Sequence, residues 1–509
     1  MKSSQQERRW STNHPGRSPA AITVVLLLAA LVGRGLLVAQ NSTVELPAQP
    51  EVRSPFVLSA VNDPATGKTS FSFDGKEIPP VIRTAPGEQI RLEYLNQMST
   101  SSHETCVDGR CTNMTNLHFH GLHVSPDSPQ DDVITMMAMP GESLRYVVDL
   151  PKDQPPGLYW YHTHPHGESY QQSLDGMSGA IIVEGIDRYV PEVKQMQERI
   201  LILRDKELQS DDAVALKAAV TLSPSKCGAA SGEPGRVFTV NGVVRPRIPI
   251  APGENQFWRI VNASPDLYAD IRVDREELNV VAIDGMPLAY HDPKRNTEKF
   301  QHFLLAPAGR VEAIVTGPPA GARSSLRTLC VDTGADGDPN PEMVLADLDE
   351  TATRKIAPSS TAIHPLSSTE AVYKPLPRHL IASVEKSAPQ YVVNFTEDKQ
   401  GFYINGKKYG PADRPMTTVK IGSYVHWRVN NNTHEGHPFH IHQVHFLVYQ
   451  SNGKPGNQPE WMDTVNVEPQ QSVDLVMDFT DPIIRGMSLF HCHLLKHEDK
   501  GMMAKILFK

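Results

Sequence analysis

The chain has 509 residues, which suffices for roughly three domains of about 150 residues each. Hydrophobic residues make up 39% of it and charged residues 21%, which excludes a disordered chain, and five cysteines are too few for a disulfide-stapled miniprotein. A net charge of −9 argues against nucleic-acid binding. The 21 histidines are the unusual feature of the composition, and their placement determines the functional prediction.

Residues 1–40 predict export. A polar, basic start with Arg8 and Arg9 is followed by an apolar run over 20–32 and small residues near Ala39. This order is typical of a secretory signal peptide, and an uncleaved N-terminal anchor is the alternative. The arginine pair leaves both the Sec and the twin-arginine routes open. The mature protein is therefore expected in the periplasm or outside the cell, without stable membrane insertion after cleavage.

Four of the cysteines fit an exported protein. Cys106 and Cys111 are close enough in sequence to close a short loop, which leaves Cys227 and Cys330 as the second pair. The alternative is that all four are free thiols. Cys492 lies in a different setting, described below.

One sequence pattern occurs three times. Each copy has a Phe-x-x-Asp/Asn-Gly turn, one or two prolines and an alternating strand, and its glycines, Gly75, Gly242 and Gly406, lie 167 and 164 residues apart. The alternating strands follow at 90–96, 257–262 and 425–430, and a later strand recurs at 144–149, 311–315 and 473–477. A period this long indicates duplicated domains rather than a solenoid.

The fold class predicted is all-β. Each copy alternates β-branched and aromatic residues with polar ones between Gly, Pro and Asn, which favours antiparallel strands in β-sandwiches. The predicted domains are 50–190, 195–352 and 379–509, with a Ser/Thr/Pro-rich linker over 353–378. Helical periodicity is scarce, and 190–199 is one short candidate helix.

Eight histidines form four His-x-His pairs. Residues two apart on a strand point to the same face, so each pair can offer two imidazoles to one place. A single pair is more simply explained as a solvated strand face. Two pairs lie in the first copy, two in the third and none in the second, which predicts a metal cluster between the first and third domains. The pairs are His118/His120, His162/His164, His440/His442 and His491/His493.

The last pair encloses Cys492 and is followed by His497 and Met502. Two histidines, a cysteine thiolate and a weak axial methionine make a blue-copper site, and His437 can supply the other imidazole. Zinc also binds His and Cys, but one closed zinc site needs only four ligands. Copper is therefore predicted, one ion at this site and three sharing the eight paired imidazoles.

Cys492 is joined through the backbone to His491 and His493. An electron leaving the blue copper would have a short covalent path to the cluster. This arrangement separates one-electron oxidation of a donor from four-electron reduction of O2.

Together these motifs resemble the multicopper oxidases, the family of laccases, ferroxidases, bilirubin oxidases and copper-efflux oxidases. The resemblance implies three cupredoxin-like Greek-key domains and four copper ions: a type 1 ion in the third domain, and a type 2 ion and a type 3 pair between the first and third. The motifs are His118-Phe-His120-Gly121, His162-Thr-His164, His437-Pro-Phe-His440-Ile-His442 and His491-Cys492-His493-Leu-Leu-Lys-His497-Glu-Asp-Lys-Gly-Met502.

By motif position, the resemblance assigns His118 and His440 to the type 2 copper. The type 3 ligands would be His120, His162, His164, His442, His491 and His493. His166 also fits the second motif, but motif position favours His162 and His164. The remaining nearby histidines, His123, His434 and His445, are expected near the ligands or at the surface rather than among them.

Two carboxylates are predicted to deliver the protons that O2 reduction consumes. In the family an acid lies some ten residues after the first motif, where Asp131 and Asp132 stand; Asp131 is preferred and Asp132 stays open. Glu498 matches an acid of the copper-efflux branch. For each, the simpler alternative is a solvated or strand-end carboxylate.

The resemblance leaves the electron donor open. The last motif is closest to copper-efflux oxidases, yet no methionine lies between Met343 and Met416, where those proteins carry a Met-rich segment; a Met136-Met137-Ala-Met139 cluster is equally explained by packing. Axial Met502 suggests a lower to moderate redox potential. The prediction is a laccase-like oxidase of phenols or aromatic amines, with a cuprous or other metal-ion oxidase and a copper-free scaffold as alternatives.

Overall fold

The computed structural model describes residues 44–99, 113–207, 235–350, 371–375, 379, 382, 384, 386–451 and 454–509. Residues 41–509 form one compact unit. The predicted signal segment, most of the predicted linker and three of the cysteines, Cys106, Cys111 and Cys227, lie outside the described residues. Within them, no helix has the length and apolar character needed to cross a bilayer.

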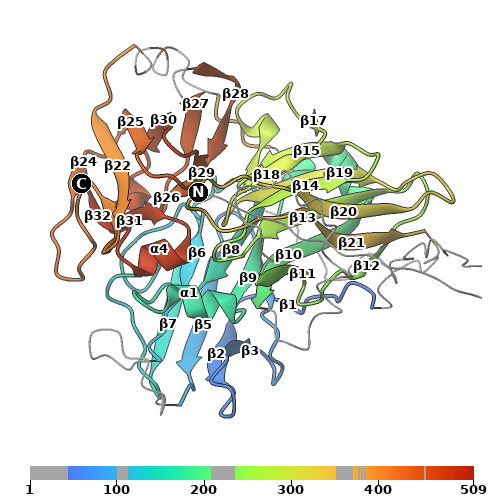
Figure 1. Ribbon diagram of the computed structural model, residues 1–509, viewed down its shortest axis with the longest axis horizontal. Helices are drawn as coiled ribbons and strands as arrows, with labels where there is room; N and C mark the ends of the chain where they lie inside the picture. The colour runs from blue at the N-terminus through green and yellow to red at the C-terminus, as the bar shows by residue number, and fades with distance from the viewer. Residues whose placement is uncertain are drawn as a thin grey trace, which may run out of the picture. The chain divides into compact units, whose positions relative to one another are not determined.

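The described residues form six β-sheets, which follow one another along the chain as three pairs (Figure 1). We call them the first, second and third sandwich. In one sheet of the first sandwich the strand order is β1 (Glu51–Val52), β4 (Val81–Thr84), β9 (Ser178–Val183), β8 (Gly157–His162), β6 (His118–His120). In the other sheet the order is β3 (Thr69–Ser72), β2 (Phe56–Asn62), β5 (Gln89–Asn96), β7 (Ser143–Asp149).

The second sandwich repeats this plan with added strands. In one sheet the strand order is β11 (Arg236–Val240), β10 (Gln197–Glu207), β13 (Asn255–Asn262), β19 (Arg310–Thr316), β15 (Leu278–Ile283), β16 (Met286–Pro287), and β17 (Glu298–Phe300) pairs with β15. In the other sheet the order is β12 (Arg247–Pro249), β21 (Met343–Asp349), β20 (Ser324–Leu329), β14 (Ala269–Val273), β18 (Phe303–Leu305).

The third sandwich follows the same plan again. In one sheet the strand order is β23 (Gly401–Ile404), β22 (Tyr391–Asp398), β25 (Ser423–Asn431), β30 (Ser472–Phe479), β27 (Phe446–Ser451), β28 (Lys454–Met462). In the other sheet the order is β24 (Thr417–Val419), β32 (Met503–Phe508), β31 (Gly486–Cys492), β26 (His437–Ile441), β29 (Thr464–Val467).

The threefold repeat is therefore present in the topology as well as in the sequence. In each sandwich, four neighbouring strands of one sheet are arranged in the same way. The first two are antiparallel, the third is parallel to the second, and the fourth is antiparallel to the third. These strands are β3-β2-β5-β7, β11-β10-β13-β19 and β23-β22-β25-β30. The all-β prediction is confirmed. The domain boundaries drawn from the sequence stay predictions, since residues 41–509 form one unit.

The glycines that mark the repeat are required by the backbone. Each follows an Asp or Asn, and both residues have positive φ, as in the tight turns that match the twist of a β-hairpin. These dipeptides are Asp74-Gly75, Asn241-Gly242 and Asn405-Gly406.

Each sandwich encloses its own apolar core, filled from both sheets. In the third, Trp427 of β25 packs against Phe439 of β26 and Phe490 of β31, with ring centroids 6.4 and 5.6 Å away. Burying a side chain such as Phe439 contributes roughly 1.5–3 kcal/mol, so these contacts hold the strand of His440 against the strand of Cys492.

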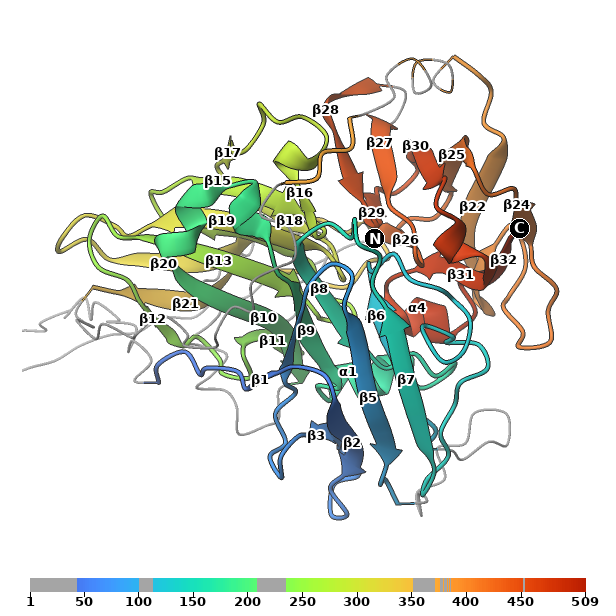
Figure 2. The same ribbon diagram turned by 180° about the vertical axis from the view of Figure 1, so that it is seen from behind.

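Helices are few and short. The candidate helix over 190–199 is wrong in type and extent: only Pro191–Gln195 is helical, as a 3-10 turn, and β10 begins at Gln197. The pairing of β10 with β13 ends the turn, because sheet hydrogen bonds replace further helical ones. Within the described residues, helix α1 (Ser169–Leu174) contacts helix α4 (Leu495–Asp499) (Figure 2).

Candidate metal centre

The predicted ligands come from equivalent strands of the first and third sandwiches. In the first, β6 pairs with β8, and His118 lies opposite His162. In the third, β26 pairs with β31, and His440 lies opposite His491. The equivalent strands of the second sandwich, β14 and β20, carry no histidine in their sequences.

All eight paired histidines meet in the interior, and none is more than 2% exposed. Their ring nitrogens form three sets, and within each set the nitrogens lie within 4.8 Å of one another. Every set joins the first sandwich to the third. The sets are His118/His120/His440, His120/His162/His493 and His164/His442/His491.

Three of these buried imidazoles lack a hydrogen-bond partner at their second ring nitrogen. His118 Nε2, His162 Nε2 and His440 Nε2 are buried with no partner among the described residues. In the same three rings Nδ1 is held, by Asp131, by the Thr163 carbonyl and by the Asp463 carbonyl.

Buried polar atoms without partners are costly, and a metal ion is the partner that imidazole lone pairs suit. Burial lowers the pKa of these histidines, so they are neutral and have a lone pair to offer. The donor set therefore fits a multinuclear metal cluster.

The blue-copper residues also come together. His437 Nδ1 lies 3.4 Å from Cys492 Sγ and 3.3 Å from His497 Nδ1. Met502 is fully buried in the same core, and its carbonyl accepts the Cys492 N–H. Burial raises the pKa of the Cys492 thiol well above its usual value, so a cation at the sulfur is what would stabilise its thiolate. Two imidazoles and a soft sulfur fit copper.

Asp131 lies against the cluster. Both of its carboxylate oxygens are 3.0 Å from His118 Nδ1, and they accept the Phe119 N–H and the Gln443 amide. Burial raises the pKa of Asp131 to about 7, although these donors stabilise the carboxylate. The neighbouring Asp132 turns away and accepts N–H groups of the turn that follows it.

Glu498 lies against two other histidines of the cluster. Its carboxylate is 3.0 Å from His491 Nδ1 and 3.5 Å from His164 Nδ1. Burial opposes its ionisation, but the two imidazoles outweigh burial and hold the pKa of Glu498 below its usual value. Helix α4 carries both Glu498 and His497, and thereby links the cluster to the cysteine site.

The histidines expected outside the ligand set have other contacts. The His166 ring lies 4.8 Å from the Tyr409 ring, and His123 and His445 lie 2.6 Å apart, nitrogen to nitrogen. His434 is exposed, with Asp336 3.4 Å away.

Two buried charges were not identified from the sequence. Asp463 Oδ1 lies 3.1 Å from His120 Nε2, and Arg310 of the second sandwich binds Asp463 through both terminal nitrogens. Arg310 outweighs the effect of burial and holds the pKa of Asp463 well below its usual value. Arg310 begins β19 and Asp463 stands between β28 and β29, and no spacing pattern in the sequence marks either residue.

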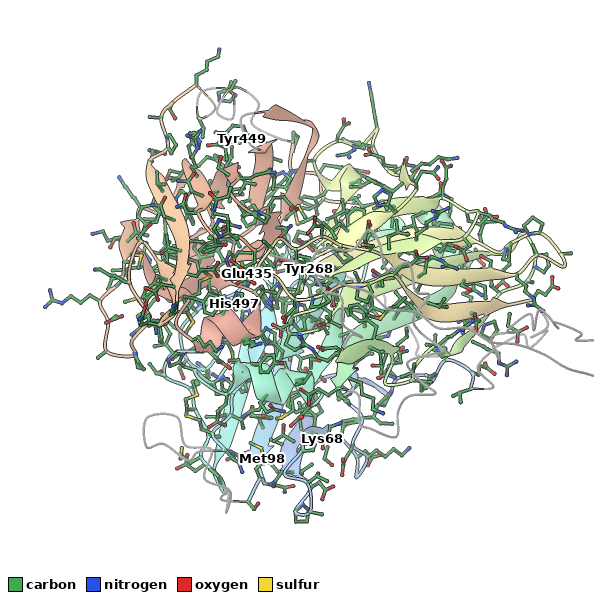
Figure 3. All side chains as sticks on the ribbon, in the orientation of Figure 1. Lys68, Met98, Tyr268, Glu435, Tyr449 and His497 are labelled. Atoms are coloured by element: carbon green, nitrogen blue, oxygen red, sulfur yellow. The ribbon has the colours of Figure 1, made fainter. Side chains whose placement is uncertain are left out.

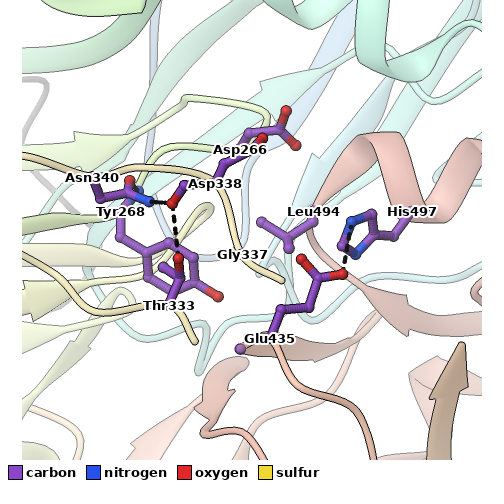
Figure 4. A pocket seen from close by; sticks show the side chains of 10 residues that line it. Asp266, Tyr268, Thr333, Gly337, Asp338, Asn340, Glu435, Leu494 and His497 are labelled. Carbon is purple, nitrogen blue, oxygen red and sulfur yellow. Dashed lines mark hydrogen bonds and ion pairs between the residues drawn. The ribbon is translucent and has the colours of Figure 1, made fainter. Parts of the chain in front are cut away.

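A pocket at His497 is lined by residues of the second and third sandwiches, of which Figure 3 labels Tyr268, Glu435 and His497. His497 Nε2 lies 3.3 Å from Glu435 Oε1 (Figure 4). Asp266 and Asp338 also line the pocket, and both pair with Arg236. Burial and the nearby carboxylates raise the pKa of Glu435 to about 9. Three carboxyl groups thus line the pocket, and the raised pKa keeps Glu435 protonated at neutral pH until a cation replaces the proton.

Comparisons agree with this geometry. Two family models described as multicopper oxidase match residues 59–187 and 383–509, together half of the chain. The chain is 24% identical to the multicopper oxidase mco of Staphylococcus haemolyticus over 86% of each protein. It is 26% identical to a laccase of Haloferax volcanii, over 86% of this chain and 77% of that protein.

The fold also matches a solved structure of a multicopper oxidase from Campylobacter jejuni, described as a metallo-oxidase. The TM-score is 0.65 at 22% identity, covering 92% of this chain and 98% of that one. The chain belongs to the multicopper oxidase family, the copper-dependent oxidoreductases that use O2 as electron acceptor.

Proposed function

We propose that the chain binds four copper ions in the arrangement its motifs imply. His437, Cys492, His497 and Met502 hold the type 1 ion, and His118 and His440 the type 2 ion. His120, His162 and His493 hold one type 3 ion, and His164, His442 and His491 the other. The observation that supports this division best is the set of inward-facing imidazole nitrogens without partners.

When bound, the coppers supply one-electron oxidation of a donor and four-electron reduction of O2 to water. The protein itself holds the sites of these two reactions at fixed positions and connects them. Cys492 is covalently continuous with His491 and His493, which connects the two sites through three residues of backbone. Asp131 and Glu498, each against a different histidine, are the carboxyl groups that can accept protons and pass them to the cluster.

We infer that the pocket at His497 receives the electron donor, and that it favours a small cation. His497 Nδ1 faces Cys492 and His437, while Nε2 faces the pocket. The imidazole ring therefore connects the cysteine site with the pocket. Among the described residues, the groups that act most on Glu435 are the carboxyls of Glu397, Asp338 and Asp266, and a bound cation would relieve their mutual repulsion. The carboxyl groups of Asp266, Asp338 and Glu435 line the pocket, which favours a cation as its occupant.

Laccase-type oxidation of phenols or aromatic amines is the second candidate. Similarity to the Haloferax volcanii laccase favours it, and an aromatic donor could be oxidised at the mouth of the pocket. The Campylobacter jejuni structure, described as a metallo-oxidase, favours the cation. Cu(I) and Fe(II) are the cations whose oxidation this chemistry suits.

Export to the periplasm or the cell exterior stays part of the proposal. It rests on residues 1–40 of the sequence and on Cys330, which is disulfide-bonded, as expected in an oxidising compartment. Cys227, its proposed partner, lies outside the described residues.

Oxygen uptake by the copper-loaded protein tests the donor assignment. Cu(I), Fe(II) and 2,6-dimethoxyphenol would be compared in the parent, in Glu435→Gln and in the control Glu468→Gln, whose carboxyl lies outside the pocket lining. A cation donor predicts that Glu435→Gln raises KM for the metal ions while KM for the phenol stays near the parent value. Equal effects on both donors, or fast uptake with the phenol alone, would favour the laccase assignment.

A further inference from the structure

The copper-free second sandwich contributes one charged side chain to the cluster region. Arg310 begins β19 and is fully buried. Its guanidinium donates to the Asp463 carboxylate at 2.7 and 2.6 Å, in the forked geometry that gives strong and directional ion pairs. It also donates to the carbonyls of Asp284 and Ala308, at 3.0 and 3.1 Å.

Asp463 joins a histidine of the first sandwich to one of the third. Its carboxylate is 3.1 Å from His120 Nε2, and its backbone carbonyl accepts from His440 Nδ1 at 2.8 Å. These contacts leave His120 Nδ1 and His440 Nε2 as the nitrogens without partners, facing the other histidines. The position of one aspartate thus decides which nitrogen each ring presents inward.

The ion pair between Arg310 and Asp463 leaves no space for a side chain at Gly121. A Cβ at this position would lie 2.5 Å from both Arg310 Nη2 and Asp463 Oδ2. Gly121 also has a φ of +83°, which other residues rarely adopt. The glycine after His118-Phe-His120 is therefore where the chain makes room for the arginine.

We propose that Arg310 is a positioning residue for the trinuclear cluster: it fixes Asp463 between His120 and His440, and through Asp463 it sets the orientation of both rings. The second sandwich, which has no proposed copper ligand, thereby controls copper affinity at the junction of the other two. This inference rests on the ligand assignment proposed above.

The test compares Arg310→Lys with the parent and with Arg259→Lys. Arg259 forms an equally buried pair with Glu312 on neighbouring strands of the same sheet, away from the histidines. Copper bound per chain is titrated with a competing chelator, and the type 2 signal is recorded by electron paramagnetic resonance. Arg310→Lys should weaken cluster copper about 10- to 100-fold and alter the type 2 signal, while blue absorbance per chain is kept.

The control should lose stability without either change. If Arg310→Lys and Arg259→Lys affect copper affinity and the type 2 signal equally, the positioning role is wrong. Asp463→Asn provides a second variant if Arg310→Lys does not fold, and parent-like copper binding by Asp463→Asn would likewise overturn the inference. A parent protein that binds no copper at the histidine cluster would instead contradict the ligand assignment.

Discussion

At the scale of single residues, the second nitrogen of each imidazole matters as much as the first. A ring can offer one lone pair inward only when its other nitrogen carries the proton, and a hydrogen-bond acceptor fixes that proton. Asp131 does this for His118, and the Asp463 carbonyl does it for His440. The site is thus arranged by acceptors that are themselves fixed in the fold.

Spacing predicted the histidines that meet in the interior, but only some of these acceptors. His118 and His120 are two residues apart because a strand repeats every two residues, so their shared face follows from the sequence. Asp131 and Glu498 could be proposed because they follow motifs closely. Asp463 lies 343 positions from the His120 it contacts, and no local pattern connects two such residues.

The role of Glu498 is tested by Glu498→Gln. The amide keeps the size of the side chain but cannot hold and release a proton, so reoxidation of the reduced protein by O2 should slow by about 100-fold or more. Return of the blue colour after mixing with O2 measures this rate. Glu312→Gln, another buried carboxyl but one paired with Arg259, should leave the rate unchanged. If donor oxidation and reoxidation slow equally in Glu498→Gln, the result would contradict a role of Glu498 in proton transfer to the cluster.

At the scale of elements, helix α4 joins the two proposed copper sites and is fixed by helix α1. Asp499, at the end of α4, accepts the N–H groups of Gly167, Ser169 and Tyr170 at 2.9, 3.3 and 2.8 Å. It therefore caps α1 from another element, since the residue at the N-cap, Glu168, makes no such hydrogen bond.

Asp499→Ala should lower the free energy of unfolding by about 1–2 kcal/mol, the cost of losing a helix cap. It should also slow reoxidation, because α4 carries Glu498. Urea unfolding and the return of colour measure the two effects. Asp175→Ala, at the other end of α1, removes hydrogen bonds from Thr69 and should lower stability without slowing reoxidation. Slowing of the same size in both variants would show that α4 is not positioned by Asp499.

At the scale of the whole molecule, the buried histidines make stability depend on pH. Burial lowers the pKa of His437 and His123 to about 3, well below the value of about 6.5 in an unfolded chain. Between these values the unfolded chain binds protons that the folded protein does not. The raised pKa of Asp131 acts in the opposite direction, but the buried histidines are more numerous, so acidification below about pH 6.5 favours unfolding.

The copper-free protein should remain folded at pH 7 but lose stability as the pH falls to 5, by up to about 1.4 kcal/mol per pH unit for each such histidine. Added copper should raise stability further at pH 7, because it binds the folded state. Urea midpoints at the two pH values, with and without copper, give the result. A copper-free midpoint that is the same at pH 7 and pH 5 would contradict the burial of neutral imidazoles.

The sequence predicted the repeat and the all-β class because turns and alternating strands are local signals, and Asn241-Gly242 or Asn405-Gly406 mark them directly. It did not predict the shortness of the 3-10 turn at Pro191–Gln195, which ends where β10 joins its sheet. Nor did it predict Arg310 or the acidic pocket at His497, since both arise from contacts between sandwiches.

The measurement that tests the central claim most directly is copper content together with blue absorbance in the parent and in Cys492→Ser. The account predicts four copper ions per chain and a strong blue band in the parent. Cys492→Ser should keep about three ions and lose the blue band, since the thiolate is its source. A blue band that survives the substitution, or a colourless parent with a single bound metal ion, would contradict the assignment of the copper sites.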